Sequence, residues 1–418
     1  MLDIKFIRKN PEKVKEGIRK KGVEVDLDEI LRLDEKRRKL QKRIDEIRAQ
    51  KNKASREIVR LKEAEREKLL KELKELDKEG DILEKEFKEI EKKFWDLMAK
   101  VPNLPFDEVP VGKDERDNVV LKEVGEIPKF DFEPKDHLEI GEALDIIDVK
   151  RAAKTSGTRF GFLKGKAVLL EFALVNFALE TLMKEGFVPV IPPVLIKEKP
   201  FWGMGYLDRG AEEVYFIEKD NLYLIGTAEQ ILGPMHMDEI FKEDELPKRY
   251  VGFSSCFRRE AGSYGKDTRG IFRVHQFDKV EMFSFCKPED SKKEHLFFLE
   301  MEERLMKALK IPYRVINICT GDLGDPAAAK FDIEAWLPGQ GRYRETHSTS
   351  NCTDYQARRL NIRYRAKDGK LHFVHTINGT AFAIGRTIIA ILENYQQKDG
   401  SVKVPEILQK YLPFKEIR

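Results

Sequence analysis

The sequence has few cysteines and no long apolar run. Its four cysteines, Cys256, Cys286, Cys319 and Cys352, lie far apart and form no CxxC pair, so they give no metal-binding pattern and fit a reducing compartment. No apolar stretch reaches the roughly 18 residues that a membrane helix requires. The first ten residues carry charge where a secretory signal would be apolar. We therefore expect a cytoplasmic protein without a membrane partner.

The sequence also has no large excess of basic over acidic residues. The 418 residues include 78 basic and 75 acidic side chains, so only the distribution of charge can point to nucleic acid. The 41% hydrophobic content excludes a wholly disordered chain. Proline occurs once in the first hundred residues, at Pro11, and returns at Pro102. We predict an N-terminal domain over residues 1–100, a linker with short strands over 101–136 and a larger domain over 137–418.

In the first domain, apolar residues repeat with the period of a coiled coil. Leu33, Leu40 and Ile47 belong to one seam, and Leu76 and Leu83 to a second. A narrow apolar seam of period 3.5 is what two supercoiled helices bury against each other. The pattern predicts an antiparallel helical arm with helices at about 27–63 and 67–99.

The first arm helix is strongly basic. From Arg32 to Lys62 it has 13 basic and 5 acidic residues. Such a stripe can neutralise the phosphates of a nucleic-acid backbone. From the arm alone, a nucleic acid and a protein partner are equally good interpretations. The candidate contacts are Arg37, Arg38, Lys42, Arg43, Lys51, Lys53 and Arg56.

Beyond residue 137, strand patterns follow one another with few helices between them. This order favours an α+β fold in which helices pack on an antiparallel sheet, rather than a doubly wound parallel sheet. We expect helices at 167–184 and 380–395. The expected strands are 187–194, 222–225, 250–257, 276–285, 313–318, 329–337 and 373–377.

Common nucleotide-binding and hydrolase motifs are absent: there is no GxxxxGK[ST], no GxGxxG after a strand and no GxSxG. Three other clusters could carry chemistry. Arg258 and Arg259 precede a glycine-rich loop at 262–270, and planar guanidinium groups suit polyphosphate. Glu345 and Ser348 could bind a hard cation. Arg386 lies in an apolar segment, where a cation is costly unless it faces an anion.

Together these segments resemble a seryl-tRNA synthetase, a class II aminoacyl-tRNA synthetase. The resemblance covers essentially the whole chain, including the arm. It is carried by 186–193 (motif 1), by 257–260, 265–270 and 275–281 (motif 2), by 378–386 (motif 3), by the TAE loop at 227–229 and by SNCTDYQARR at 350–359. Two segments depart from the family pattern, at Thr346-His347 and at Thr380-Ala381.

The resemblance implies a two-step reaction. ATP and L-serine would form seryl-adenylate, and the seryl group would pass to tRNA(Ser), with tRNA(Sec) as a second candidate. It also implies Mg²⁺, a homodimer formed through motif 1 with the arm of one subunit serving the other's site, and no zinc. Arg258 and Arg386 would be catalytic. Serine would contact Thr227, Ala228, Glu229, Arg258, Glu281 and Thr380. ATP would contact Arg258, Arg259, Glu260, Val274, Phe277, Glu345, Thr346, His347, Ser348 and Arg386, with Mg²⁺ at Glu345 and Ser348.

Single residues also have ordinary structural explanations: Glu281 could lie on a strand surface, Phe277 in the core, and Thr380 at a helix N-cap. Three other functions remain open. A synthetase-like ligase for a carrier protein would lack the arm, and a non-catalytic tRNA-binding paralogue would lack the motif arginines. A purely structural coiled-coil protein would leave residues 137–395 unexplained.

Overall fold

The computed structural model describes residues 1–261, 267 and 269–418, without the side chain of Arg60. The chain forms two compact units. One comprises 2–19 and 23–101, and the other comprises Met1, 20–22 and 102–418. No helix among the described residues is both long enough and apolar enough to cross a membrane.

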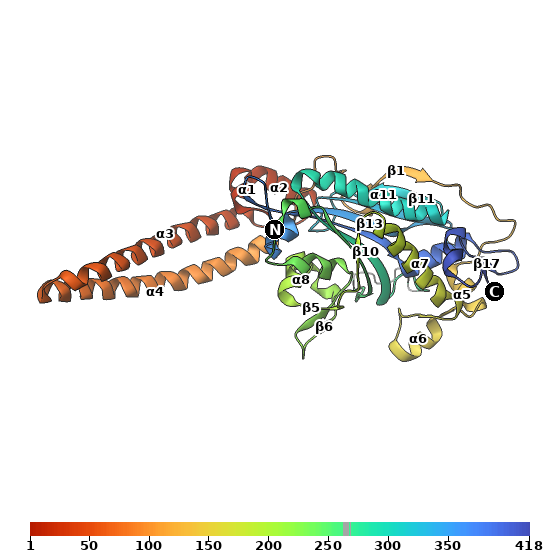
Figure 1. Ribbon diagram of the computed structural model, residues 1–418, viewed down its shortest axis with the longest axis horizontal. Coiled ribbons are helices and arrows are strands. Elements are labelled where there is room, and N and C mark those ends of the chain that lie inside the picture. Colours follow the sequence, from red (N-terminus) through yellow and green to blue (C-terminus); the bar gives the residue numbers. More distant parts are fainter. Residues whose placement is uncertain (262–266, 268) are drawn as a thin grey trace. The chain divides into compact units, whose positions relative to one another are not determined.

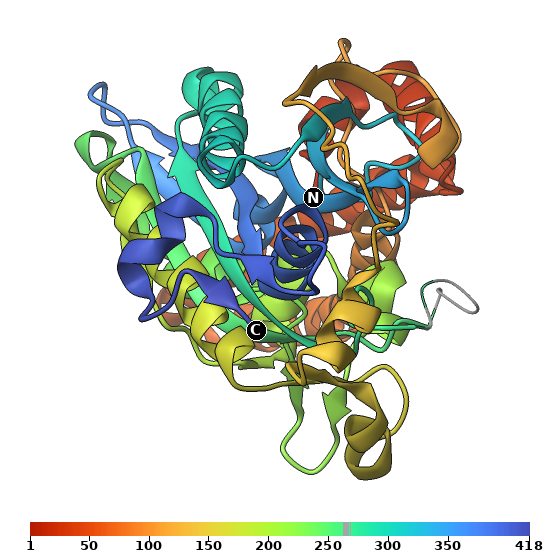
Figure 2. The same ribbon diagram turned by 90° about the vertical axis from the view of Figure 1, so that its right-hand side faces the viewer.

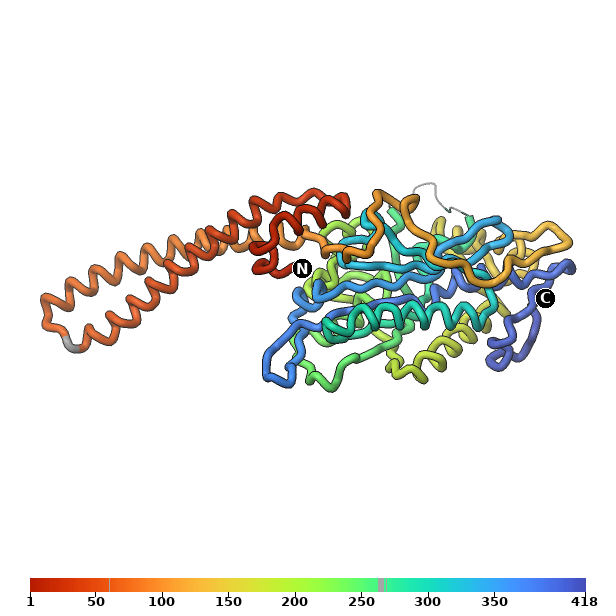
Figure 3. Tube along the Cα trace, turned by 90° about the horizontal axis from the view of Figure 1, so that it is seen from above, coloured from red at the N-terminus to blue at the C-terminus, as the bar shows by residue number. Residues whose placement is uncertain are grey.

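The first unit contains the expected helical arm, and this prediction is confirmed. Figures 1 and 3 show α3 and α4 side by side and antiparallel. Ile30, Ile44 and Ile47 of α3 are buried in the seam. The first long helix ends at Glu57, earlier than predicted, and the second begins earlier, at Glu63, because acidic residues in a first turn favour helix initiation. The helices are α1 (Ile4–Lys9), α2 (Pro11–Lys20), α3 (Leu27–Glu57) and α4 (Glu63–Ala99), with a 3₁₀ turn at Ile58–Arg60.

The second unit is built on an eight-stranded sheet of order β1-β11-β12-β13-β16-β10-β9-β4. Every neighbouring pair is antiparallel except β4 with β9, which confirms the predicted sheet type. Its strands are β1 (Val119–Val124), β4 (Val188–Val190), β9 (Lys248–Phe257), β10 (Gln276–Cys286), β11 (Tyr313–Asn317), β12 (Ala329–Leu337), β13 (Arg342–Thr353) and β16 (His375–Ala383). The smaller sheets use β2 (Ile147–Asp148), β3 (Phe162–Leu163), β5 (Leu195–Lys197), β6 (Phe216–Ile217), β7 (Leu222–Leu224), β8 (Ile240–Lys242), β14 (Arg363–Arg365), β15 (Leu371–Phe373), β17 (Val402–Lys403) and β18 (Glu416–Ile417).

Three long helices share one hydrophobic core with this sheet. Leu174 of α7, Phe298 of α11 and Ile388 of α13 are buried there beside Val280 and Met282 of β10. Figure 2 shows α11 in teal and α13 in dark blue beside the strands. Alternate residues of β10 therefore face away from this core. The helices of this unit are α5 (His137–Ala143), α6 (Val149–Ser156), α7 (Lys166–Met183), α8 (Glu198–Met204), α9 (Leu207–Gly210), α10 (Glu229–Leu232), α11 (Ser291–Leu309), α12 (Tyr355–Leu360) and α13 (Ile384–Asn394).

The structure refines the sequence-based expectations and departs from them at several points. The segment 101–136, expected as a linker with short strands, contributes β1, an edge strand paired with β11. The expected helix at 380–395 begins only at Ile384, because residues 375–383 form a central strand that is paired on both sides. Strand β13 and helix α11 were not predicted.

Candidate active site

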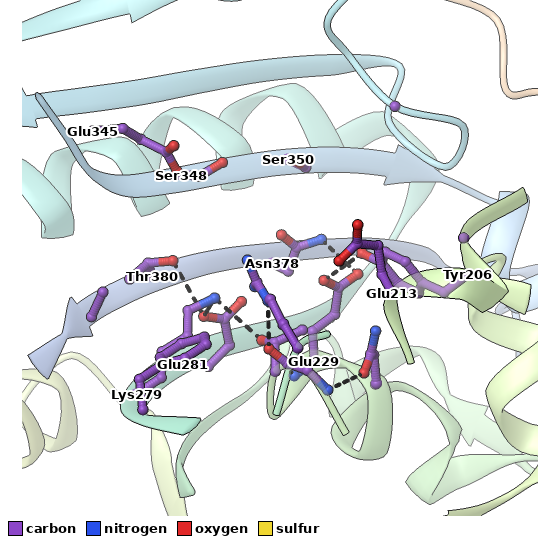
Figure 4. A pocket seen from close by; sticks show the side chains of 18 of the residues that line it. Tyr206, Glu213, Glu229, Lys279, Glu281, Glu345, Ser348, Ser350, Asn378 and Thr380 are labelled. Carbon is purple, nitrogen blue, oxygen red and sulfur yellow. Dashed lines mark hydrogen bonds and ion pairs between the residues drawn. The ribbon is translucent and has the colours of Figure 1, made fainter. Parts of the chain in front are cut away.

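A cavity of about 640 Å³ opens on the face of the sheet opposite the main core. Strands β10, β13 and β16 form its floor, and segments near residues 206–214, 226–230 and 323–327 form its walls. Figure 4 shows side chains from all three strands in it. A volume of this size is typical of small-molecule sites. We call the part around Arg258, Arg386, Glu345 and Ser348 the arginine end. The part around Thr227, Glu229, Lys279, Glu281 and Thr380 is the acidic end.

The two motif arginines line the same cavity. Arg258 follows β9, donates from Nε to the carbonyl oxygen of Gly226 at 3.1 Å, and lies 5.2 Å from the ring centre of Phe277. Arg386, in the first turn of α13, donates to the carbonyl oxygen of Glu345 at 2.9 Å. These residues are far apart in the sequence, yet the charges of both lower the pKa of Glu345. The structure therefore brings two guanidinium groups to one anion-binding space.

A β-bulge brings Glu345 and Ser348 to the same face of β13. Residues three apart on a regular strand point to opposite faces. Here the pairing with β12 shifts between Ile333 and Glu334, so Thr346 is the extra residue. As a result, Glu345, Thr346 and Ser348 all line the cavity, and Figure 4 shows Glu345 beside Ser348.

The donors at the arginine end suit a hard cation. Although burial opposes it, the charges of Arg386, Lys330 and Arg258 lower the pKa of Glu345 to about 2, so its carboxylate is ionised. A carboxylate and a hydroxyl oxygen are ligands that Mg²⁺ accepts, usually together with waters and substrate phosphates. Among the described residues, no group of three or more His, Cys, Asp or Glu side chains could hold a metal by itself. The residues present therefore fit a cation that substrate phosphates also bind.

At the acidic end, three donors surround the carboxylate of Glu229. Tyr206 donates from its hydroxyl at 2.8 Å, and the amides of Gln356 and Asn378 donate at 3.0 Å each. The amide of Gln356 is oriented in turn because Thr376 donates to its oxygen at 2.6 Å. Burial, followed by the charge of Glu281, raises the pKa of Glu229 to about 7. The three hydrogen bonds fix the orientation of the Glu229 carboxylate, which in its ionised form can bind a cation.

A second buried carboxylate, Glu281, lies beside Lys279 on the same face of β10. The Lys279 ammonium is 2.6 Å from a Glu281 oxygen and donates to the Thr227 hydroxyl at 3.2 Å. Thr380, on the neighbouring strand β16, donates to Glu281 at 3.4 Å. Figure 4 shows Thr380, Glu281 and Lys279 as neighbours joined by dashed lines. This end of the cavity therefore offers both charged groups and hydroxyl groups.

Residues expected to bind the nucleotide base also line this cavity. Val274, Phe277 and Glu260 line the cavity. The Glu260 carboxylate accepts a hydrogen bond from Arg273 at 2.6 Å. An aromatic ring, an apolar side chain and a carboxylate are suitable for stacking on a base and accepting from its amino group.

Three expected site residues do not line the cavity. Ala228 is fully buried in the core beside Leu232. The side chain of Arg259 is exposed, while its backbone N–H donates to Glu213 at 2.9 Å. His347 follows Thr346 on β13 and points to the other face, where its ring lies 5.8 Å from Phe382. Most of the expected glycine-rich loop, 262–266 and 268, lies outside the described residues.

The cavity also contains residues that were not selected from the sequence. Lys279 and Asn378 line the cavity, whereas Gln356 is buried behind Glu229 and donates to it. All three lie in segments that carry the family resemblance, which assigned them no role. Tyr206 lies in a segment with no recognisable pattern. Lys330 lines the arginine end, and its partner Asp332 lies 3.4 Å away.

The arm cations fall into two groups. Arg37 is packed 4.4 Å from the ring centre of Phe94, and Arg43 is 2.8 Å from Glu79 of α4. Lys51 pairs with Asp77 of α4. These three cations contact α4 and therefore help to hold the two helices of the arm together. The candidates whose side chains are exposed to solvent are Arg38, Lys42, Lys53 and Arg56.

Known proteins resemble both units. Residues 1–105 match the family described as seryl-tRNA synthetase N-terminal domain, and 214–395 match the class II core domain of tRNA synthetases (G, H, P, S and T). A serine–tRNA ligase from Dictyoglomus turgidum is 50% identical, covering 100% of this chain and 99% of that protein. Seryl-tRNA synthetase from Pyrococcus horikoshii, solved with ATP, is 46% identical with a TM-score of 0.93, covering 100% and 99%. The cytoplasmic enzyme from Naegleria fowleri, solved with AMP, is 36% identical with a TM-score of 0.88, at the same coverage.

Proposed function

The chain belongs to the seryl-tRNA synthetase family, and from this premise we propose how its cavity uses ATP to join L-serine to tRNA(Ser). The observation that carries the proposal is that Arg258 and Arg386, together with Glu345, line one cavity. The motif arginines also argue against a non-catalytic paralogue. Because the helical arm is present, a ligase for carrier proteins is the weaker alternative.

In the first step, the serine carboxylate attacks the α-phosphorus of ATP, and pyrophosphate leaves. This reaction needs alignment of two anions and neutralisation of their charge more than it needs proton transfer. Arg258 would hold the α-phosphate and the serine carboxylate, while Arg386 would hold the terminal phosphate. Both are fixed in place before substrate arrives, which is the requirement for electrostatic stabilisation of the transition state.

Glu345 and Ser348 would hold Mg²⁺ together with the phosphates, consistent with the ionised carboxylate of Glu345. When bound, the ion neutralises phosphate charge during displacement. Phe277 would stack on adenine, with Val274 beside the base. Glu260 would accept from the adenine amino group. Because Glu260 is bonded to Arg273, we expect this pair to adjust when the nucleotide binds.

The acidic end would recognise serine itself. Glu229 would take the ammonium group, and Glu281 with Thr380 the hydroxyl group. A site that hydrogen-bonds a substrate hydroxyl rejects an analogue without it strongly, since buried polar groups would be left unpaired. We therefore expect alanine to be a very poor substrate.

In the second step, a hydroxyl of the terminal ribose of the tRNA attacks the acyl carbon of seryl-adenylate. We propose that the exposed cations of α3 contact the phosphate backbone of that tRNA. tRNA(Sec) is a second candidate substrate, and the long variable arm of the tRNA is the proposed contact.

We also propose that the protein is a cytoplasmic homodimer. Leu169, Phe172 and Met183 of α7 are exposed, as are Val188 of β4 and Ile191 just beyond it. Helix α7 and strand β4 are in contact with each other, and exposed apolar patches often mark an interface. All four cysteines are buried and free, as expected in a reducing compartment. Light scattering at micromolar protein should give twice the 48.7 kDa chain mass, and a monomer would contradict the proposal.

Exchange of labelled pyrophosphate into ATP tests the activation step. We expect exchange with L-serine, little with L-threonine and little with L-alanine. Equal exchange with threonine, or none with serine, would refute the function. Serine loading of a purified carrier protein, in place of tRNA, would support the alternative ligase.

A further inference from the structure

The acidic end contains a buried cation for which the proposed reaction has no assigned role. Lys279 is only 8% exposed, on β10 two residues before Glu281, and it lines the cavity. A buried lysine costs free energy unless it is paired and hydrogen-bonded. Its ammonium meets both conditions, through Glu281 at 2.6 Å and Thr227 at 3.2 Å.

Among the residues that the structure describes, the buried charges of this end do not balance by themselves. Glu229 and Glu281 are two carboxylates, 4% and 1% exposed, and Lys279 is one ammonium. One negative charge is left for a ligand cation. Lys279 is bonded to Glu281, whereas Glu229 is surrounded by the neutral donors Tyr206, Gln356 and Asn378. The uncompensated charge therefore resides on Glu229.

This asymmetry decides how an amino acid can sit in the cavity. An ammonium group is drawn to Glu229, which forms no ion pair with any described residue, and it is repelled by Lys279 from Glu281. A hydroxyl group, which is neutral, can still donate to the ion-paired Glu281. Thr227 also takes part, since its oxygen already accepts from Lys279 and from the backbone N–H of Glu229, which leaves its own proton to donate.

We propose that Lys279 is a specificity-determining residue that orients serine by neutralising Glu281, so that the ammonium binds Glu229 and only a neutral side chain fits beside Glu281. This inference rests on the proposed serine site. It extends that site by naming what the pocket rejects, which is a substrate with a second cation in place of the hydroxyl.

L-2,3-diaminopropionate is the probe for this idea, because it replaces the serine hydroxyl with an amine. The assay is pyrophosphate exchange with serine and with diaminopropionate, at a pH at which the side-chain amine is protonated. The wild-type protein should use serine and reject diaminopropionate. In K279M, serine kcat/KM should fall about 10- to 100-fold, and the ratio of serine to diaminopropionate kcat/KM should fall at least about tenfold, because Glu281 becomes free to bind a cation.

Three further variants separate orientation from folding. K279R keeps the charge and should keep the rejection of diaminopropionate, even if its serine KM rises. K279Q can still donate to Thr227 and provides a second neutral variant if K279M does not fold. K330M removes a lysine from the arginine end of the same cavity and should leave the substrate ratio unchanged. The KM for ATP in K279M and K279Q should stay within about threefold of wild type.

The outcomes are distinguishable. If the wild-type protein shows no serine-dependent exchange, the proposed function fails. If that exchange is present, but folded K279M and K279Q keep the wild-type ratio within about twofold, the role of Lys279 is refuted. A ratio that falls equally in K330M would also overturn it, because the effect would then follow the cavity's net charge rather than the pair with Glu281.

Discussion

The arm and the cavity use the same ionic residue types in opposite environments. On the arm, Arg43 and Glu79 form a pair in which each side chain is 41% exposed. In the cavity, Lys279 and Glu281 form a pair in which the side chains are 10% and 2% exposed. Exposed pairs contribute only about 0.2–1 kcal/mol each, so they exchange partners readily. Buried pairs are held rigidly, because separating them would leave a charge without water or partner.

This difference assigns different tasks to the two regions. Arm cations can leave their carboxylate partners and bind phosphates wherever a nucleic-acid backbone runs, which suits binding without base recognition. Cavity charges are positioned before the substrate arrives, which suits catalysis and selection of a small molecule. The comparison therefore predicts that damage to the arm and damage to the cavity affect different steps.

Removing the arm should have the largest effect, and on one step only. Deleting residues 32–93 and joining the ends with a short glycine-rich linker should lower tRNA charging by at least about 1,000-fold, because the phosphate contacts are lost. Pyrophosphate exchange should remain within about twofold of the full chain. Charging that survives unchanged would show that the arm does not bind the tRNA.

Arg258→Ala should have the next largest effect, on the opposite step. Loss of a positioned transition-state charge should lower serine-dependent pyrophosphate exchange by about 100- to 1,000-fold. If the rate of exchange fell tenfold or less, another group would provide the charge that stabilises the transition state. Arg258→Ala should leave the binding of tRNA, measured by filter retention, unaffected. Arg38→Ala, on the arm, is the matched control for the exchange assay: it also removes an arginine, but pyrophosphate exchange should be retained.

Serine binding should depend on pH through Glu229. Because the pKa of this carboxyl is raised to about 7, it takes up a proton as the pH falls below 7 and can no longer bind the serine ammonium. The KM for serine should therefore rise towards tenfold for each unit of pH lost, while the KM for ATP does not follow it. Glu229→Gln should bind serine weakly at every pH, and a KM for serine that does not change between pH 8 and about 6 would contradict this role.

Single exposed arm cations should have the smallest effects. Lys42→Ala or Lys53→Ala should raise the KM for tRNA about two- to threefold and lower the slope of log affinity against log salt by about one. Their side chains are 80% and 78% exposed, and each is 4.0 Å from its nearest carboxylate. Arg43→Ala should also weaken the hairpin, measured as a lower melting temperature. If Lys42→Ala, Lys53→Ala and Arg43→Ala lowered the melting temperature equally, the distinction between the two groups of arm cations would be wrong.

Much of this fold could be predicted from the sequence where apolar residues set the pattern. The heptads of the arm are one case, and the alternation of β12 is another. Strand β13 could not be found this way, because Glu345, Ser348 and Ser350 face the cavity and make the segment polar. In α11, the polar residues Glu294, His295, Glu302 and Glu303 are buried, which obscures its amphipathic pattern. The apolar run at 375–394 contains a strand and a helix, and composition does not separate them.

The site shows the same limit. The resemblance supplied Arg258, Arg386 and Glu345, yet only the sheet order explains how residues so far apart in sequence share one cavity. His347 was assigned to the nucleotide, but a bulge one residue earlier sets which side chains face inward. The contact of Lys279 with Thr227 depends on how the loop at 226–230 lies against β10, and no local pattern encodes that.

The most direct test of the account is a double-mutant cycle on the two arginines, with serine-dependent pyrophosphate exchange measured for wild type, Arg258→Ala, Arg386→Ala and the double variant. If both guanidinium groups hold one triphosphate, their effects are coupled, and the double variant should be no more than about tenfold worse than the poorer single variant. A loss equal to the product of the two single losses would show that they act independently and would contradict a shared substrate.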